Sequence, residues 1–434
     1  MPELNYFIDT EYPDMDLSIE SLRLELGLRD KRQVKALRFL LCNLHSAKGR
    51  FLLVSRRKQS IDSKELNPLQ IKYPSLINCL DILIERDYVD LVEKGDYSKK
   101  KKTSITSSEK LDNWFKDNNW TNDKIEIKSP QYVTLREPKL FKEDKPPQVD
   151  YEDTDYSLWL KDKLASYSNL LNQSDITVID ELGEVTKRFN HIVMQRKFIK
   201  RVSKHPNTEF LFSGRMPAPW CNMSSEERAN NLRINGNQVI EIDRPASHIN
   251  AMYEVVTGSP YQDGYPYDLT INGIDIPKHI VKNASSIMQS SETVEDTART
   301  VGRNYSQKAK AKNAKEKDIK NFEDYKDFMS SHKDITLKLI INTFLDKHPK
   351  VREHYLKGKP YGDLIRCWEA DIVFESVMKL TEMGIPTLTV YDSFIVEKHY
   401  EEVVEDIIKE TRYQDRRHLS QDTVKSLGMF SLVK

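Results

Sequence analysis

The segment Leu388–Glu397 reads LTVYDSFIVE, an apolar run typical of a buried strand that carries a single aspartate, Asp392, in its middle. Burying an unpaired carboxylate costs several kcal/mol, roughly, unless the group is paired, protonated or bound to a metal ion. A second segment, Gln238–Gly258 (QVIEIDRPASHINAMYEVVTG), has the same design, because an apolar strand ends at Asp243 and a helical pattern follows. Either aspartate alone could simply end its strand and cap the next helix. The shared design makes Asp243 and Asp392 candidates for one common site.

Two carboxylates on adjacent strands are the protein ligands that a two-metal site requires. Such carboxylates can hold two Mg²⁺ ions about 3.5–4 Å apart. Mg²⁺ uses few protein ligands and completes its shell with water and substrate phosphates. We therefore expect Asp243 and Asp392 to bind two Mg²⁺ ions, for which Mn²⁺ could substitute. The cations would also offset the cost of keeping Asp392 ionised.

The residues around both aspartates resemble the palm domain of family A nucleic-acid polymerases, which include bacterial repair-type DNA polymerases and single-subunit phage RNA polymerases. Ser213-Gly214-Arg215 is similar to the Gly-Arg element of the DNA enzymes, and Arg233 precedes the hairpin turn signal Asn235-Gly236. Asp243 then matches the first catalytic aspartate of the family, and Tyr391-Asp392-Ser393 matches the second catalytic motif. The resemblance implies a template-directed nucleotidyltransferase, in which Arg215 and Arg233 bind the backbone of the template and primer.

A closer resemblance is to polymerase-like proteins of phages and mobile elements, whose first motif continues into a helix. Here that motif is Asp243–Gly258, with His248, Met252 and Tyr253 in register. The resemblance implies that His248 and Tyr253 line the nucleotide pocket. The DNA enzymes have glutamate and the RNA enzymes have glycine at the position of His248, so the choice between dNTP and NTP stays open.

Between the two aspartates, the family places a helix of the fingers whose basic residues hold the incoming triphosphate. The segment SSHKDITLKLIINTF is our candidate for it, with Lys338 on the same helical face as Asn342 and with Lys333 one to two turns earlier. Lysine suits this role as a mobile point charge on phosphates. An ordinary amphipathic helix with exposed lysines is the alternative. We expect the Lys-rich segment from Ala298 to Lys320 to be a mobile insertion of the fingers.

The pattern along the chain predicts an α+β protein with three parts. Residues 1–117 are predicted to form a helical, winged-helix-like domain, residues 118–152 a linker or strap, and residues 153–434 a polymerase-like right hand. In the third part, thumb-like helices are expected at 153–204, the palm at 205–260 and 384–434, and the fingers at 261–383. The N-terminal domain has the order helix, helix, strand, basic loop, strand, and the loop contains Lys99, Lys100, Lys101 and Lys102. We expect this loop to contact DNA, although a domain that only packs against its neighbour would give the same pattern.

The composition indicates a highly charged globular protein. The chain has 434 residues with 67 basic and 67 acidic side chains, and 31% of its residues are charged. It contains no apolar run of about 18 residues, so no membrane span is expected. The N-terminus is acidic and lacks the pattern of a signal peptide, which favours the cytoplasm of a bacterial or phage-infected cell. The expected partners are a DNA template, nucleoside triphosphates and a protein that supports processivity or assembly.

Three other functions remain open from the sequence. A reduced single-subunit RNA polymerase would use the same motifs. A non-catalytic DNA-binding initiator or regulator could have kept a degenerate palm, and a metal-dependent nuclease could use the same two aspartates. The N-terminal stretch FIDTE resembles the first motif of a proofreading exonuclease, but the basic helical region that follows favours a chance match.

Overall fold

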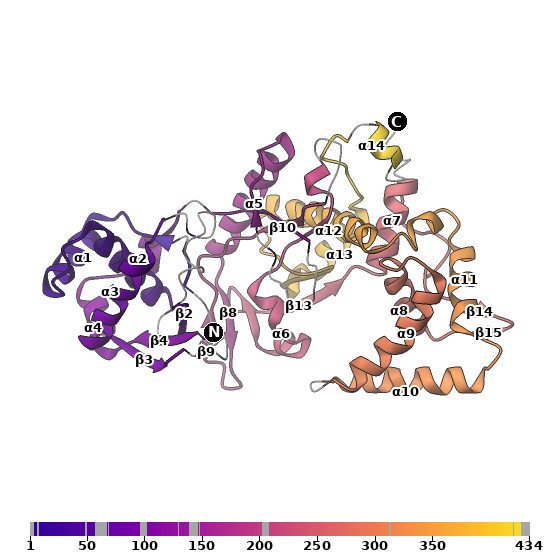
Figure 1. Cartoon of the computed structure of the whole chain (residues 1–434), viewed down its shortest axis with the longest axis horizontal. Helices are drawn as coiled ribbons and strands as arrows, with labels where there is room; N and C mark the ends of the chain where they lie inside the picture. The colour runs from indigo at the N-terminus through magenta and orange to yellow at the C-terminus, as the bar shows by residue number, and fades with distance from the viewer. Residues whose placement is uncertain are drawn as a thin grey trace. The chain divides into compact units, whose positions relative to one another are not determined.

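The computed structural model is an α+β protein (Figure 1). It describes residues 4–6, 8–47, 50–56, 67, 69–95, 102–128, 130–138, 146, 148–201, 208–311, 314–419 and 421–426. The chain divides into two compact units, Met1–Gln131 and Tyr132–Lys434. The division falls inside the segment 118–152 that was predicted as a linker, and this segment contains short strands on both sides of the division. No helix in the described ranges is long and apolar enough to cross a bilayer.

The first unit packs its helices on small antiparallel sheets. The amphipathic helix α2 buries Leu37, Leu40 and Leu41, and it packs on α3, α1, β1 and β4. The strands pair in the order β2-β4-β3, and β1 pairs with β5. Helix α4 begins at Ser108, whose hydroxyl accepts a hydrogen bond from the backbone N–H of Leu111 at 3.2 Å. The elements are β1 (Ile8–Asp9), α1 (Pro13–Glu25), α2 (Lys31–Ala47), β2 (Leu52–Val54), α3 (Tyr73–Glu85), β3 (Val89–Glu93), β4 (Thr103–Ser107), α4 (Glu109–Asp117), η2 (Asn122–Lys124) and β5 (Glu126–Ile127).

Two larger sheets organise the second unit. One has the strand order β11-β10-β6-β7, and the other has the order β16-β17-β13-β12-β8-β9. Their strands are β6 (Val133–Arg136), β7 (Gln148–Val149), β8 (Ile176–Ile179), β9 (Val185–Arg188), β10 (Arg196–Ile199), β11 (Ser213–Arg215), β12 (Leu232–Ile234), β13 (Asn237–Asp243), β16 (Leu388–Val390) and β17 (Ser393–Glu397), and a separate hairpin joins β14 (Thr270–Ile271) to β15 (Ile274–Asp275).

The helices of the second unit connect these sheets, and several of them pack on one another in a separate core. Those that precede the hairpin of β14 and β15 are α5 (Asp155–Gln173), η3 (Thr208–Phe210), η4 (Pro219–Asn222), α6 (Ser225–Asn231) and α7 (Ser247–Thr257). Those that follow it are α8 (Lys278–Met288), α9 (Val294–Ala309), α10 (Glu316–Ser331), α11 (Leu337–Lys347), η5 (Arg352–His354), α12 (Lys359–Glu382), η6 (Lys398–Tyr400), α13 (Glu401–Glu410) and α14 (Gln421–Ser426).

Two stretches of this unit differ from the sequence predictions. Within the range 153–204, we expected a second thumb-like helix over residues 185–204. This prediction is wrong, because β9 and β10 form there instead. Its Val, Thr, Phe and Ile residues suit a pleated surface, and pairing with β8 and β6 decided the structure. The expected mobile insertion from Ala298 to Lys320 is instead largely helical, since it falls in α9 and the start of α10.

The long helix α12 connects two hydrophobic cores. Phe374 and Val377 belong to the core that also contains α5 and the six-stranded sheet, whereas Trp368 and Ile372 belong to the core of α7, α8, α9 and α11. A helix that is buried on all sides needs partners for every polar side chain that it carries. The acidic residues of α12 have them, because Asp363, Glu369, Asp371 and Glu375 all pair with arginines from other elements. Ion pairs with arginines, of which those of Asp371 are the most deeply buried, therefore hold α12 in place.

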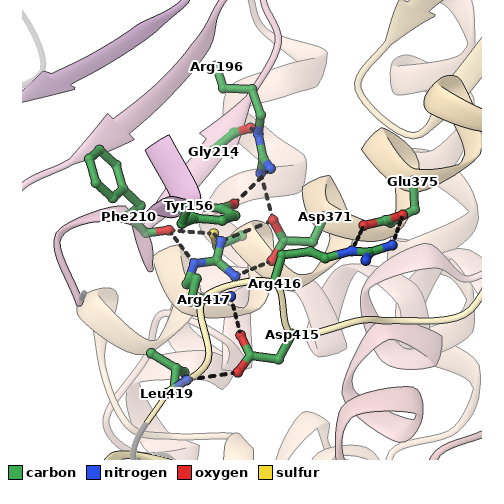
Figure 2. A network of polar contacts seen from close by, with 11 residues as sticks. Tyr156, Arg196, Phe210, Gly214, Asp371, Glu375, Asp415, Arg416, Arg417 and Leu419 are labelled. Carbon is green, nitrogen blue, oxygen red and sulfur yellow. Dashed lines mark hydrogen bonds and ion pairs between the residues drawn. The ribbon is translucent and has the colours of Figure 1, made fainter. Parts of the chain in front are cut away.

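Figure 2 shows the most deeply buried of these networks. Asp371 accepts hydrogen bonds from Arg196 at 2.8 Å and from two nitrogens of Arg417 at 2.8 and 3.0 Å. Arg196 also donates to the carbonyl of Gly214 at 2.7 Å, and Arg417 donates to the carbonyl of Phe210 at 2.9 Å. Gly214 has φ +69°, and a Cβ there would come within 2.5 Å of the Arg196 guanidinium. Only glycine therefore fits beside this network.

Candidate active site

The structure brings Asp243 and Asp392 together from distant parts of the chain. Strands β13 and β17 pair antiparallel, and Asp243 at the end of β13 lies opposite Ser393 at the start of β17. The hydroxyl of Ser393 donates a hydrogen bond to the Asp243 carboxylate. The backbone N–H of Arg244 donates to the carbonyl of Asp392 at 3.2 Å. The two aspartates therefore sit at the same end of two paired strands.

Asp392 does not lie in the middle of one strand, as the sequence suggested. It occupies a two-residue turn with Tyr391, which joins β16 to β17. Tyr391 has φ +60°, a left-handed conformation that is uncommon for an aromatic residue, and 56% of it is exposed. The turn contains no glycine or asparagine, so the sequence carried no hairpin signal there. Asp392 is consequently half-buried, while Asp243 is exposed.

Three further side chains meet beside the aspartates. Arg215 of β11 donates to the Glu369 carboxylate of α12 at 2.6 Å. His248, in the first turn of α7, has its Nε2 atom 3.2 Å from the same carboxylate and 3.3 Å from the Arg215 guanidinium. That guanidinium also stacks over the Tyr391 ring, with 5.0 Å between its carbon and the ring centroid. Arg215 thus connects the buried Glu369 to the turn that carries Asp392.

The surroundings shift the pKa values of Glu369 and Asp392 in opposite directions. Burial disfavours ionisation of Glu369, but the charges and hydrogen bonds of His248 and Arg215 outweigh it and hold the pKa of Glu369 at about 2. Asp392 behaves in the opposite way. Burial and then the negative charge of Glu369 raise its pKa, and the Asp243 carboxylate adds to this rise. A cation bound between Asp243 and Asp392 would therefore relieve a repulsion that the protein itself leaves in place.

Glu369→Gln is expected to lower the free energy of unfolding by about 1–3 kcal/mol near neutral pH, because it weakens two charge-assisted hydrogen bonds. A lowered carboxyl pKa stabilises the fold above the unfolded-state value of about 4.3, and this stabilisation is lost as the pH falls towards 2. Urea unfolding from pH 7 to pH 2.5 would measure the difference between variant and wild type. Glu382→Gln, at the exposed end of the same helix, is the matched control. A difference that does not shrink on acidification would contradict this account of Glu369.

The residues available to hold a metal ion are Asp243 and Asp392. Across the described ranges, no group of three or more histidine, cysteine, aspartate or glutamate side chains is arranged to bind one. Glu369 and His248 already pair with each other and with Arg215. Two carboxylates with room for water and phosphate ligands suit Mg²⁺, which seldom uses an all-protein cage.

Several predicted site residues are not brought to this cluster by any contact among the described residues. Lys338 of α11 is exposed and forms an ion pair with Glu295 of α9 at 2.8 Å, and Lys333 is exposed between α10 and α11. The hydroxyl of Tyr253 lies 3.0 Å from Nδ1 of His348 in the helical core.

Among the described residues, no contact brings Arg233, which was predicted to bind nucleic acid, to this cluster. The Arg233 guanidinium donates to the backbone carbonyls of Asn230 and Leu232. Lys102 precedes β4 in the first unit, and Lys99, Lys100 and Lys101 lie outside the described residues.

Glu369 is the residue of the site that sequence reasoning missed. It belongs to the run WEADIVFE, in which charged residues interrupt an apolar helical stretch. A carboxylate in such a run needs a buried partner, and that requirement was the available signal. The partner itself, Arg215, could not be identified, because nothing in the spacing relates β11 to α12.

Comparison of the chain with protein-family models, with curated proteins and with solved structures finds no match.

Proposed function

We propose that this chain is a template-directed nucleotidyltransferase that adds nucleotides to a nucleic-acid strand. One observation carries the proposal: Asp243 and Asp392 lie at one end of the paired strands β13 and β17, next to the Arg215–Glu369–His248 cluster. These are also the positions at which the sequence resembles the catalytic motifs of family A polymerases. The proximity of the two carboxylates that the resemblance marks supports the proposal.

Each side chain of the site has a defined role in this proposal. Two Mg²⁺ ions, or Mn²⁺ ions, held by Asp243 and Asp392 would activate the 3′-hydroxyl and neutralise charge on the triphosphate. Glu369 fixes the orientation of Arg215, which presents its remaining N–H groups to phosphate oxygens. His248 pairs with Glu369 beside the aspartates and would contact the sugar. Lys338 and Lys333 are exposed, and they would reach the triphosphate only if α11 approaches the aspartates when substrate binds.

The wider architecture fits the same proposal. The sheet that carries both aspartates would serve as the palm, α8 to α11 as the fingers and α5 as a reduced thumb. The first unit, as a winged-helix-like domain, would bind DNA. Its helix α3 has no basic residue, whereas α2 exposes Lys31, Arg32 and Lys35. We therefore assign the DNA contact of this unit to α2 and to the basic loop before β4.

A non-catalytic DNA-binding protein is the second candidate, and one observation favours it. Arg215 and His248 are both already paired with Glu369, so less positive charge remains for a triphosphate than their number suggests. In that case Asp243 and Asp392 could be replaced without loss of DNA binding or biological activity. A single-subunit RNA polymerase differs from the first proposal only in its preference for NTPs.

Nucleotide incorporation tests the proposal directly. Purified protein would receive labelled dNTPs or NTPs with Mg²⁺ or Mn²⁺ on primed and unprimed DNA, beside an Asp243→Asn variant. We expect extension by the wild type and a loss of at least about a thousandfold in the variant, comparable to the loss of an essential catalytic group. The preferred nucleotide would separate the DNA and RNA polymerase alternatives. Shortening of labelled DNA without any nucleotide would indicate a nuclease, and DNA binding without incorporation would support the non-catalytic alternative.

A further inference from the structure

A second polar site lies in the same unit, at the four-stranded sheet. It is a cavity of about 340 Å³ between the C-terminal ends of the parallel strands β6 and β10 and the first two turns of α12. Helix α12 presents Lys359, Asp363 and Arg366 to it, which are spaced so that they share one face of the helix. Strand β11 lines the cavity with Ser213, and Arg215 of the candidate active site is two residues further along this strand.

The cavity carries a clear excess of positive charge. Its lining includes five basic residues, Arg136, Lys197, Arg201, Lys359 and Arg366, and two acidic residues, Glu137 and Asp363. The net charge of the lining is therefore +3. Asp363 is buried and is shared by Arg201 and Arg366, and Glu137 is exposed. Within the described residues, Arg136, Lys197 and Lys359 form no ion pair.

The environment of these cations favours an anionic ligand. Burial and the neighbouring charge of Arg136 lower the pKa of Lys197. In addition, the buried Nε atoms of Arg136 and Arg201 lack a hydrogen-bond acceptor among the described residues. An unpaired buried donor is costly, and an anion in the cavity would offset the repulsion between these clustered cations. The rest of the lining is Ser213, Ile199, two prolines and the deeply buried Phe198, so it offers no open aromatic face for a base.

We propose that this cavity binds phosphate groups of a polynucleotide strand. Clustered lysine and arginine side chains at the start of a helix provide the charge and the N–H donors that phosphate oxygens require. The position beside β11 would place the bound strand near Arg215 and the two aspartates. The proposal shares its ligand, nucleic acid, with the proposed function, but it does not depend on catalysis.

The test measures strand binding without nucleotide or metal ion, so that a failure of incorporation cannot affect it. A labelled single-stranded oligonucleotide would be titrated with wild type and with a Lys197→Gln/Lys359→Gln double variant in EDTA at several salt concentrations. This variant leaves the pairs of Asp363 intact. Lys350→Gln/Lys357→Gln removes the same charge from exposed positions outside the cavity and is the matched control. Equal unfolding temperatures would show that all three proteins are folded.

We expect the cavity variant to bind the strand about tenfold more weakly and to show a smaller salt dependence. The slope of log affinity against log salt should fall by about 0.7 for each phosphate that the variant no longer neutralises, while the control keeps the wild-type slope. Equal affinities and slopes for the two double variants would overturn the proposal, as would a wild type that binds no strand.

A second arm would compare unfolding temperatures in inorganic phosphate and in chloride of equal ionic strength. If phosphate stabilises only proteins with the intact cavity while strand binding is unaffected, the ligand is a free phosphate compound and the assignment to a polynucleotide is overturned.

Discussion

Asp392→Asn is expected to abolish nucleotide incorporation and, at the same time, to raise the unfolding temperature of the metal-free protein. The loss of activity follows from the proposed function, because an uncharged amide at this position is a poor ligand for Mg²⁺. We expect a decrease of at least about a thousandfold, in keeping with the loss of an essential catalytic group. The gain in stability follows from the structure, because the ionised carboxylate is held beside Glu369 and Asp243.

The sign of the stability change depends on the raised pKa of Asp392. Burial and the neighbouring carboxylates make the folded protein hold this proton more tightly than the unfolded chain does, whose aspartate pKa is about 3.9. The ionised form therefore destabilises the fold, and the penalty grows as the pH rises from about 4 through the raised pKa. Asparagine removes this penalty. The variant should be more stable than wild type at pH 7, and the two should converge near pH 3.5.

Thermal unfolding in EDTA from pH 3.5 to pH 7 and an incorporation assay on the same preparations would measure both effects. Asp334→Asn, an exposed position between α10 and α11, is the matched control and should change neither quantity. Retention of a tenth or more of the wild-type activity would exclude Asp392 as a metal ligand. A lower unfolding temperature for Asp392→Asn at neutral pH would show that the carboxylate contributes stability. Both results together would leave the site with no catalytic interpretation.

The strands that carry Asp243 and Asp392 were predictable from short-range patterns, whereas their pairing was expected only from the resemblance to a polymerase palm. An apolar run that ends at an aspartate reads as a strand wherever it occurs, and two such strands can pair. The hairpin turn itself was not predictable, since Tyr391 in a left-handed conformation contradicts local preference. Tertiary structure, including the contact between the Tyr391 ring and Arg215, decides the conformation there.

The contacts of α12 could not be predicted for a different reason. The acidic residues of this helix are visible in the sequence, but their arginine partners are far away, and the spacing of either set does not identify the other. Lys338 illustrates the same limit. The helical pattern placed Lys338 on a polar face, and the residue is indeed exposed. The position of α11 relative to Asp243, however, depends on packing between helices. Sequence patterns specify elements, whereas the meeting of distant side chains is a property of the packed core.

Asp371→Ala is expected to lower the free energy of unfolding of the second unit by about 3–5 kcal/mol, the usual cost of removing one partner from a buried ion pair. Two arginines depend on this carboxylate, and both Arg196 and Arg417 have only 1% of their side chains exposed. The variant would leave both guanidinium groups buried without an acid. No comparable change is expected in the first unit, which has its own core.

Glu375→Gln provides the matched control, because it lies one turn further along α12 and pairs with Arg416, of which 44% is exposed. Its loss should cost about 1 kcal/mol or less, as for partly exposed pairs. Urea unfolding followed by hydrogen exchange would locate the loss in one unit. A cost below about 1 kcal/mol for Asp371→Ala would show that water or a neighbouring group replaces the carboxylate. Arg196 also holds the carbonyl of Gly214 next to Arg215. Under the proposed function, a destabilised but folded Asp371→Ala protein should therefore also lose nucleotide incorporation, although Asp371 has no contact with Asp243 or Asp392 among the described residues.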